Sequence, residues 1–451
     1  MVPKDVVQKI ETYNGNKIKF AVVDIDGVLR GKVISKDKFL KGLDSGIGFC
    51  DVVFGWDIND AVYGNSQVTG WHTGYPDAEA TIDPSTYRTI PWEKDTPFFL
   101  ADFSQSDDFS EVCPRTLLKK IRGQCQELGY KAVFANEFEW FNFRETPQTL
   151  HDKDYHKPTP LTPGMFGYSI LRSSQNASFF NDLYDQLHDF GIPLEGQHTE
   201  TGDGVYEASI AYTDVLKAAD RASLFKSGVK EIAYKHEIIA SFMAKWNKDL
   251  PGCSGHIHQS LWDRETNKNI FYDAEQDAGI SKLLEQYIAG QLYCLPHILP
   301  MYAPSINSYK RYVEGSWAST TVSWGIGNRT TALRVITPDE SSARLETRVP
   351  GSDANPYLSM AASLASGLYG IRNELSLDIP MTEGNEYDNS GNRPLPTTLK
   401  EATEAMKSSE LSQELFGETF VDHFIRTREW EWKQFSKQVT DWELKRYFEI
   451  I

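Results

Sequence analysis

Two histidines separated by one apolar residue, His256 and His258, follow a run of small residues between Pro251 and Gly255. In a β-strand successive side chains point to opposite faces, so both imidazoles would share one face and Ile257 would pack on the other. Glycines before the histidines would let the backbone approach a ligand closely. This stretch is equally compatible with a ligand site and with a half-buried strand in which two histidines alternate.

Carboxylates in two other stretches favour the ligand site. Glu137 and Glu139 are two residues apart in the largely apolar segment 132–141. Two negative charges on one face of such a strand are costly unless a cation compensates them. Glu200 and Glu207 flank a Gly-rich turn that is typical of a hairpin, which would bring them close together. We therefore expect a buried cation site here rather than an edge strand.

Alternation also places arginines beside a further carboxylate, because Arg344, Glu346 and Arg348 would lie on one face of a strand. Sites dominated by carboxylates suit Mg²⁺ or Mn²⁺, and one imidazole shifts the preference modestly toward Mn²⁺. Arginines beside such ions meet the needs of phosphoryl transfer. The residues thus predict metal-dependent nucleotide chemistry, with Glu137, Glu139, Glu200, Glu207, Glu346 and His256 as candidate metal ligands and Arg329, Arg334, Arg344 and Arg348 as candidate anion binders.

The elements that must position these groups divide the chain into an N-terminal β-rich unit, residues 1–108, and a larger unit, residues 109–451. Apolar runs, Pro, Gly and helical periodicity predict the following elements: strands at 20–23, 98–103, 132–141 and 255–260, a hairpin at 195–207, helices at 114–128, 176–190, 213–243, 280–296 and 355–371, loops at 144–164 and 375–395, and helical structure from there to Ile451.

The stretch from Asp24 to Val28 offers a competing interpretation. An apolar strand ending in D-x-D-G-V resembles the nucleophile motif of haloacid-dehalogenase-like phosphatases. Such an enzyme would also need a lysine and a further acidic pair behind later parallel strands, and no convincing G-D-x-x-x-D segment follows an apolar strand. A hairpin whose Asp-Gly turn leads to a return strand at 30–33 is the better interpretation.

Composition excludes several classes of protein. The chain has 451 residues, 40% of them hydrophobic and 12% aromatic, which is enough for a substantial core. The 63 acidic and 46 basic residues give a formal charge of -17, which argues against nucleic acid as a partner. Five scattered cysteines without a C-x-x-C pair argue against a disulfide framework and a structural zinc site. With no apolar signal region or bilayer-length run, we expect a soluble cytoplasmic protein that does not bind membranes.

Six phrases occur in the order seen in the glutamine synthetase superfamily: E-F-E-W-F, H-T-E-T-G-D-G-V-Y-E, G-C-S-G-H-I-H-Q-S, N-S-Y-K-R, G-N-R-T-T-A-L-R and R-L-E-T-R-V-P-G-S-D-A-N-P-Y-L. The resemblance spans residues 23–444. It implies an α+β fold, with an N-terminal β-grasp domain (1–108) and a C-terminal catalytic domain (109–451) built on an antiparallel sheet with flanking helices. It also implies stacked rings, such as a dodecamer, in which neighbouring subunits share active sites.

In such enzymes ATP phosphorylates the γ-carboxylate of glutamate, and a nitrogen nucleophile then displaces phosphate. By motif position, the resemblance implies that one Mg²⁺ or Mn²⁺ is held by Glu139, Glu200 and Glu207, and the other by Glu137, His256 and Glu346. It further implies ATP contacts from His258, Ser260, Arg334 and Arg344, a contact of Arg329 with the transferred phosphoryl group, glutamate contacts from Gly252, Arg311 and Arg348, and Asp57 of an adjacent subunit near the incoming nitrogen.

Two positions depart from the pattern of ammonia-using members. Trp317 stands where those members carry a Glu that closes over the intermediate and helps deprotonate ammonium. An indole cannot take that proton, but it can cover an alkyl or aryl group. An aromatic or apolar residue at this position resembles the γ-glutamyl-amine ligases, including the γ-glutamylputrescine synthetase branch. Pro251 replaces an Asn that contacts glutamate, so the acid substrate is less firmly indicated.

The sequence therefore predicts a ligase that joins glutamate to an organic amine. Two alternatives remain open at this stage. One is a glutamine synthetase that uses ammonia, and the other is a structural relative that has kept the fold without turnover.

Overall fold

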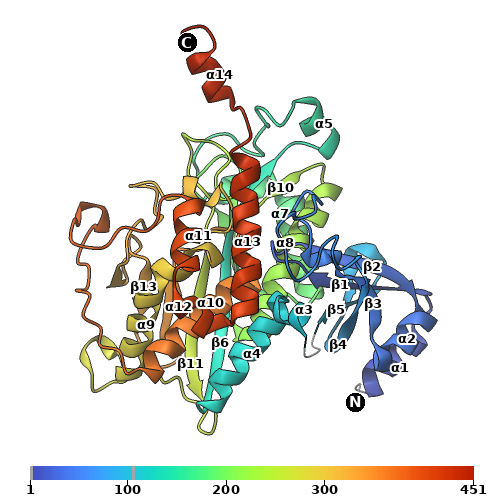
Figure 1. The fold of residues 1–451 in the computed structure, drawn as a ribbon, viewed down its shortest axis with the longest axis horizontal. Helices are drawn as coiled ribbons and strands as arrows, with labels where there is room; N and C mark the ends of the chain where they lie inside the picture. Colours follow the sequence, from blue (N-terminus) through green and yellow to red (C-terminus); the bar gives the residue numbers. More distant parts are fainter. Residues whose placement is uncertain (1–3, 104–106) are drawn as a thin grey trace.

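The computed structural model describes residues 4–103 and 107–451, and its strands form two separate sheets (Figure 1). In the described N-terminal part, five strands pair in the order β2-β1-β5-β4-β3. The strand β1 is antiparallel to β2 and parallel to β5, and helix α2 packs on the sheet. This order is that of the predicted β-grasp unit. The elements are α1 (Lys4–Thr12), β1 (Lys17–Val23), β2 (Leu29–Ser35), α2 (Lys36–Ser45), β3 (Ile47–Cys50), β4 (Asp77–Ile90) and β5 (Thr96–Asp102).

The turn between β1 and β2 is the hairpin that the sequence predicts, and its acidic residues are tied into the fold. Asp24 accepts hydrogen bonds from the backbone N–H groups of Asp26 (3.0 Å) and Val28 (2.8 Å) and from Arg30 Nε (2.8 Å). Asp26 accepts one from Arg428 Nη2 at 2.5 Å. Since both carboxylates hold the turn and its neighbours together, they are engaged in structure rather than displayed as a phosphatase nucleophile pair.

The second sheet carries the candidate site. Among the described residues it has nine strands, with the path β12-β13-β14-β11-β6-β8-β7 and with β9 and β10 also paired to β6. All pairs are antiparallel except β12 with β13, so the sheet is antiparallel as predicted, with one parallel pair at its edge. The strands are β6 (Tyr130–Phe143), β7 (Leu194–Thr199), β8 (Val205–Ile210), β9 (Thr213–Asp214), β10 (Ile239–Ser241), β11 (Gly255–Asp263), β12 (Trp324–Ile326), β13 (Leu333–Ile336) and β14 (Arg344–Thr347).

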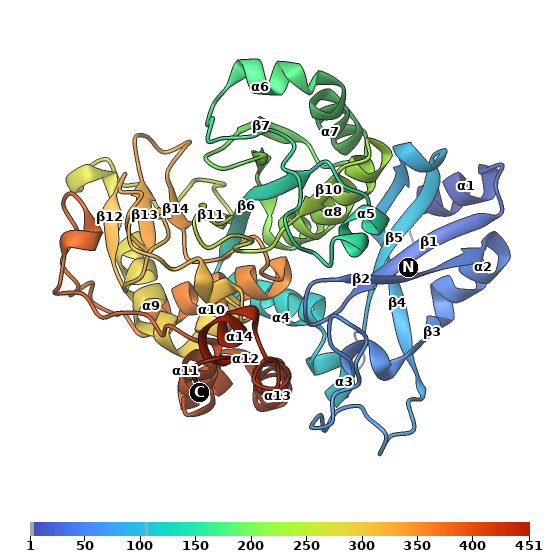
Figure 2. The same cartoon turned by 90° about the horizontal axis from the view of Figure 1, so that it is seen from above.

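Helices pack on the face of this sheet away from the candidate site and bury one large apolar core (Figure 2). Almost every residue of the Ala- and Ser-rich helix α10 is buried, because it lies between other helices rather than at the surface. The helices are α3 (Asp108–Glu111), α4 (Pro114–Glu127), α5 (Pro147–Asp152), α6 (Ile170–Gln175), α7 (Ala177–Asp189), α8 (Val215–Lys235), α9 (Lys282–Ile298), α10 (Pro356–Arg372), α11 (Leu399–Lys407), α12 (Glu410–Phe416), α13 (Glu418–Phe435) and α14 (Asp441–Tyr447).

Two predicted elements need correction. The stretch 144–164 is not entirely loop, because Pro147 and a Thr146 capping box start the short helix α5. The helix predicted over 213–243 ends at Lys235, and the residues after it turn back to form β10 on β6. Both errors concern local boundaries that depend on capping and on strand pairing.

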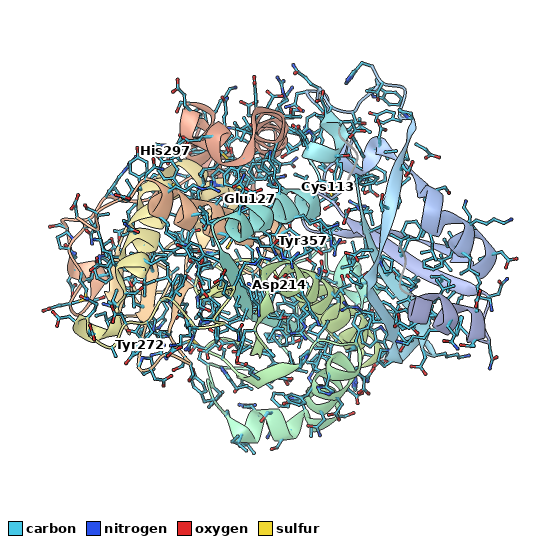
Figure 3. The ribbon with its side chains drawn as sticks, turned by 90° about the horizontal axis from the view of Figure 1, so that it is seen from below. Cys113, Glu127, Asp214, Tyr272, His297 and Tyr357 are labelled. Atoms are coloured by element: carbon cyan, nitrogen blue, oxygen red, sulfur yellow. The ribbon has the colours of Figure 1, made fainter. Side chains whose placement is uncertain are left out.

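A buried ion-pair network joins the two sheets. Arg115, at the start of α4, pairs with Asp102 of β5, with Asp83 of β4 (2.7 Å) and with Asp220 of α8 (2.8 Å). The hydroxyl of Tyr357, which is labelled in Figure 3, donates to Asp220 at 2.6 Å. Burial alone would lower the pKa of the Arg115 guanidinium, but the surrounding carboxylates raise it well above its usual value. Each charge is paired, so the network holds the two units together.

The boundary predicted at residue 108 falls at the start of α3, between the last strand of the first sheet and the first helix of the second unit. This division remains a prediction. At the other end, α14 projects away from the body of the molecule (Figure 1). All five cysteines are free thiols, and four of them are buried. No described helix is long and apolar enough to cross a membrane.

Candidate functional site

One cavity of about 500 Å³ on the second sheet brings together most of the predicted site residues. The strands β6, β7, β8, β11, β13 and β14 supply most of its charged side chains, and segments between the regular elements supply the remaining lining residues. The predicted residues that line it are Glu137, Glu139, Glu200, Glu207, Gly252, His256, His258, Arg311, Trp317, Arg329, Arg334, Arg344, Glu346 and Arg348.

Three neighbouring strands build what we call the central cluster: Glu137 of β6, His256 of β11 and Glu346 of β14. Strand register explains it, because His256 lies directly opposite Glu137. His256 Nδ1 is 3.2 Å from Glu137 Oε1 and 3.4 Å from Glu346 Oε1. His258, two residues along β11, lies on the same face with Nε2 3.8 Å from Glu137, as the alternation predicts.

Guanidinium groups already compensate the charge of the central cluster. Arg334 Nη1 donates to Glu346 Oε2 at 2.8 Å, and Arg348 Nη1 donates to Glu346 Oε1. Burial alone would raise the pKa of Glu346, but His258 and these arginines lower it to about 2. Burial, together with Arg348, lowers the pKa of His256 to about 4, so this imidazole is neutral. Glu346 is therefore a carboxylate with its charge intact inside the protein.

A second set, which we call the outer cluster, consists of His198 of β7, Glu200 just after β7 and Glu207 of β8. His198 Nε2 is 3.1 Å from Glu207 Oε1, and His198 Nδ1 is 3.7 Å from Glu200 Oε2. Glu207 also faces Glu139 across the β6–β8 pair. The sequence prediction grouped Glu139 with Glu200 and Glu207; the structure places all three in one cavity but puts His198 in the tight group.

Little positive charge offsets these carboxylates. Burial, and then the neighbouring Glu207, raises the pKa of Glu139 to about 8. Burial also raises the pKa of Glu207 despite its contact with His198. Burial would lower the pKa of His198, but its hydrogen bond to Glu207 and the charge of that carboxylate raise it to about 9. At neutral pH, His198 and Glu139 therefore hold protons in the absence of a metal. A divalent cation would take the place of these protons and remove the repulsion between the carboxylates.

Two residues of this region were missed from the sequence. His198 precedes Glu200 by two residues in an extended segment, so alternation alone could have placed both on one face. Tyr168 stacks on His198 with ring centroids 4.4 Å apart. Its backbone N–H donates to the carbonyl of Thr199 at 2.7 Å, which fixes the loop over β7. No sequence signal indicated this contact, because a loop 30 residues upstream supplies it.

The donor atoms fit divalent cations of the Mg²⁺ and Mn²⁺ type. Among the described residues, His256 Nε2 and Glu200 Oε2 are buried polar atoms without a hydrogen-bond partner. Each cluster offers carboxylate oxygens and one imidazole nitrogen within 4.8 Å of one another. Oxygen-rich sites with one imidazole suit Mn²⁺ and Mg²⁺ better than zinc.

In the cavity wall formed by the loop after β10, the backbone at Gly252 lies very close to neighbouring atoms. A Cβ on Gly252 would lie 2.4 Å from the carbonyl oxygen of Ala244 and 2.7 Å from Arg311 Cγ, so only glycine fits. Arg311 donates through Nη1 to Ser254 Oγ at 3.1 Å and through Nη2 to the carbonyl of Val349. These contacts fix a buried guanidinium in the cavity wall, where it can bind a carboxylate.

A smaller adjoining cavity of about 280 Å³ contains Ser260 and shares Glu137, His258 and Arg344 with the main one. Arg344 Nε donates to His258 Nδ1 at 3.3 Å, so the two residues are coupled at the junction. Ser260 Oγ accepts a hydrogen bond from Trp262 Nε1 at 2.9 Å. Three of the predicted nucleotide contacts, His258, Ser260 and Arg344, therefore line this smaller cavity, while Arg334 lines the main one.

At the rim, Trp317 lies in a turn with a positive φ of 62° and is 59% exposed. Ser316 donates to the carbonyl of Arg311 at 3.2 Å and to that of Val313 at 2.5 Å, which fixes the turn before it. The indole therefore stands at the mouth of the cavity, where no side chain of the described chain covers most of its surface.

Asp57 is the predicted residue that does not line either cavity in this chain. Its Oδ1 accepts the backbone N–H groups of Asn59 (2.9 Å) and Ala61 (3.0 Å). Its Oδ2 accepts Trp430 Nε1 of α13 at 2.9 Å. Asp57 is thus a largely buried carboxylate, 9% exposed, in the N-terminal unit, and its approach to a site in another subunit stays a prediction.

Residues 111–447 match the family described as "Glutamine synthetase, catalytic domain". The "Type-1 glutamine synthetase 2" of Dictyostelium discoideum is 50% identical over 99% of this chain and 86% of its own length. The "Glutamate--isopropylamine ligase" of a Pseudomonas species is 39% identical over 98% and 97%. The "Gamma-glutamylethanolamide synthetase GlnA4" of Streptomyces coelicolor is 34% identical over 96% and 92%.

The fold is also similar to a solved structure titled as a complex of GmaS with ADP. The TM-score is 0.86, with coverage of 99% of this chain and 100% of the other. At 24% sequence identity this likeness concerns the fold alone.

Proposed function

This chain belongs to the glutamine synthetase family, and we propose that it is an ATP-dependent ligase that joins the γ-carboxylate of glutamate to an organic amine. The observation that carries the choice of an amine is Trp317 at the mouth of a cavity that is otherwise equipped for phosphoryl transfer. Ammonia-using members of the family place a proton-accepting Glu at this position. Two relatives named as ligases of isopropylamine and of ethanolamine support the same choice.

The cavity supports a division of roles among its residues. Divalent cations, proposed as Mg²⁺ or Mn²⁺, would neutralise the charge of the nucleotide phosphates. They would be held by Glu137, His256 and Glu346 at the central cluster and by His198, Glu200 and Glu207 of the outer cluster together with the neighbouring Glu139. His258, Ser260, Arg334 and Arg344 would contact ATP, Arg329 the transferred phosphoryl group, and Gly252, Arg311 and Arg348 glutamate.

The reaction follows from this arrangement. Arg311, fixed by Ser254 and Val349, orients the glutamate carboxylate in the wall of the cavity. The γ-carboxylate oxygen attacks the terminal phosphorus of ATP, ADP leaves, and the acyl phosphate is formed. The lone pair of the amine then attacks the γ-carbonyl carbon, the C–O bond to phosphate breaks, and the nitrogen loses a proton. Trp317 would cover the amine and keep water from the acyl phosphate.

The proton acceptor is proposed to be Asp57 of an adjacent subunit in stacked rings. Its carboxylate is held in one orientation by Trp430 and two backbone N–H groups. We include assembly into a dodecamer and a cytoplasmic location in the proposal, the latter resting on five unpaired cysteines.

A phosphate-release assay with glutamate, ATP and Mg²⁺ tests the proposal. Methylamine, isopropylamine, putrescine and an aromatic amine are compared with ammonium, and the amide product is identified by mass spectrometry. We expect at least one amine to exceed ammonium in kcat/KM. Turnover with low millimolar ammonium and with no amine would contradict the choice of an amine.

A glutamine synthetase that uses ammonia is the second candidate, and the 50% identical relative named as one favours it. Replacement of Trp317 by Glu restores the ammonia-type residue and should shift preference toward ammonium, while Trp317→Phe should not. A structural relative without turnover is a third alternative. The complete set of candidate ligands argues against it, and failure of every amine and of ammonium to stimulate ATP cleavage would support it.

A further inference from the structure

We propose that the amine substrate is a small monoamine with an uncharged tail, and that diamines and polyamines are poor substrates. This inference rests on the proposed amine-ligase function and names the substrate class of the same site. It follows from which charges in the cavity are already engaged and from the chemistry of the side chains at its mouth.

Every acidic side chain among the described residues of the cavity lining is a candidate metal ligand, either in one of the two clusters or, for Glu139, beside the outer cluster. These side chains are Glu137, Glu139, Glu200, Glu207 and Glu346. The remaining charged lining residues are imidazoles and the guanidiniums of Arg311, Arg329, Arg334, Arg344 and Arg348. A second ammonium group on the amine would therefore meet no carboxylate that is free to pair with it, and would be buried beside positive charge. Burial of an unpaired charge is strongly unfavourable.

The mouth of the cavity carries aromatic side chains and one exposed cation, Arg329, but no free carboxylate among the described lining residues. Trp317, Tyr168, Pro251 and Ser316 line it, and Trp317 and Tyr168 are 59% and 71% exposed. Such side chains can cover an alkyl or small aryl tail through the apolar area that both partners bury.

A cation-π contact at these rings does not replace a carboxylate. One face of Tyr168 is occupied by His198, whose ring centroid is 4.4 Å away. Cation-π contacts at exposed rings contribute only about 0.5–1 kcal/mol.

Nearby carboxylates outside the lining do not supply the missing partner. Glu314 lies three residues before Trp317, but it is exposed and does not line the cavity. If the loop that carries Asp57 enters from a neighbouring subunit, its Asp60 is already paired with Arg30 Nη1 at 2.6 Å. The cavity of about 500 Å³ must also hold glutamate and the transferred phosphoryl group, which limits the tail to a few carbon atoms.

The test compares n-butylamine with 1,3-diaminopropane, which have the same number of heavy atoms and differ by a methyl group in place of the second ammonium. Steady-state kcat/KM values are normalised to the concentration of the species with one unprotonated nitrogen. We expect n-butylamine to be preferred by about tenfold or more, as the burial of one unpaired charge requires. Equal or better turnover of the diamine would overturn the inference and leave the amine-ligase function standing.

Turnover with ammonium and with no amine, or a lack of turnover with every nitrogen donor tested, would instead contradict the proposed function itself. Three variants test whether the tail of the amine lies beside Trp317. Trp317→Glu supplies a carboxylate at the mouth and should raise the relative kcat/KM of the diamine several-fold, whereas Trp317→Phe should keep the wild-type ratio. Glu314→Gln should also keep it. An unchanged ratio in W317E, or a changed ratio in E314Q, would overturn the placement of the tail beside Trp317.

Discussion

The central and outer clusters contain the same kinds of ligand in contrasting electrostatic environments. In the central cluster, Arg334 and Arg348 pair with Glu346, and the pKa of His256 is lowered to about 4 by burial and Arg348. In the outer cluster His198 is the positive partner, and its pKa is raised to about 9 chiefly by Glu207 against the effect of burial. One cluster is compensated by permanent charges and the other by protons.

This difference indicates what each cluster can do before any cation binds. Guanidiniums keep Glu346 of the central cluster ionised and in place, so this ligand is organised in advance. Protons on the outer cluster must leave when a cation arrives, so binding there changes the charge of the site itself. We therefore expect the central cluster to tolerate changes of pH and the outer cluster to respond to them.

The largest expected effect is that of removing the charge of Glu346. Glu346→Ala should abolish phosphoryl transfer, and the isosteric Glu346→Gln should lower it by about 10²- to 10³-fold or more, because the site loses an anionic ligand. Both variants leave Arg334 and Arg348 without a carboxylate. Loss of one partner of a buried pair costs about 3–5 kcal/mol.

Phosphate release, Mn²⁺ titration and thermal unfolding of each variant measure these effects separately. Normal turnover of Glu346→Ala would mean that the central cluster is not a metal site. A loss of activity with unchanged Mn²⁺ binding would assign Glu346 to positioning the two arginines only.

The second effect concerns His198, which only the structure identifies. His198→Gln should weaken Mn²⁺ binding at the outer cluster by about 10- to 100-fold and leave the central site unchanged. Tyr168→Phe keeps the ring that stacks on His198 and serves as the matched control. Electron paramagnetic resonance titration of the chelator-treated protein distinguishes two classes of site. If His198→Gln weakened Mn²⁺ binding equally at both classes of site, the proposed distinction between the clusters would be contradicted.

The smallest effect is on the thermal stability of the metal-free protein. The pKa of His198 is raised to about 9, so its protonated form stabilises the folded state fully below the ordinary value of 6.5 and loses this effect as the pH rises through about 9. The pKa of Glu139 is raised to about 8, so its ionisation penalises the folded state increasingly from 4.5 to about 8. Melting temperature should therefore fall by a few degrees between pH 6.5 and 9.

The pKa values of Glu346 and His256 are lowered to about 2 and about 4, so the central cluster should change its protonation only below pH 6.5. Scanning fluorimetry in EDTA at pH 6.5, 8 and 9 measures the change, and His198→Gln should remove part of it. A melting temperature that stays constant or rises across this range would contradict the assignment of protons to the outer cluster.

The sequence predicted the central cluster well because its ligands lie on regular strands. Alternation placed His256 with His258, and Arg344 with Glu346 and Arg348, on common faces, and the sheet confirms both. The pairing of these strands with each other could not be derived, because residues far apart in the sequence lie opposite one another, as Glu137 does to His256 and His258 does to Glu346. The resemblance to a family supplied that information instead.

Other features depend on contacts that local patterns do not contain. The position of His198 depends on the register of the β7–β8 pair, which shifts between Leu194 and Gly196. Tyr168 reaches the site from a loop, and Arg115 meets Asp220 across 105 residues of sequence. Alternation indicates only that His198 shares a face with Glu200. The contacts of Tyr168 and Arg115 have no periodic signal, so they became visible only once the chain was folded.

The Arg115 network has a consequence for how substrates enter. A buried guanidinium shared by Asp83, Asp102 and Asp220 would lose several partners if the two sheets swung apart, so hinge bending between them is opposed. The two sheets then keep a fixed relative position. Opening of the cavity to substrates would require movement of short surface segments, such as the turn that ends at Trp317. Catalytic turnover would be gated by the motion of a few residues rather than by the closing of one half of the molecule on the other.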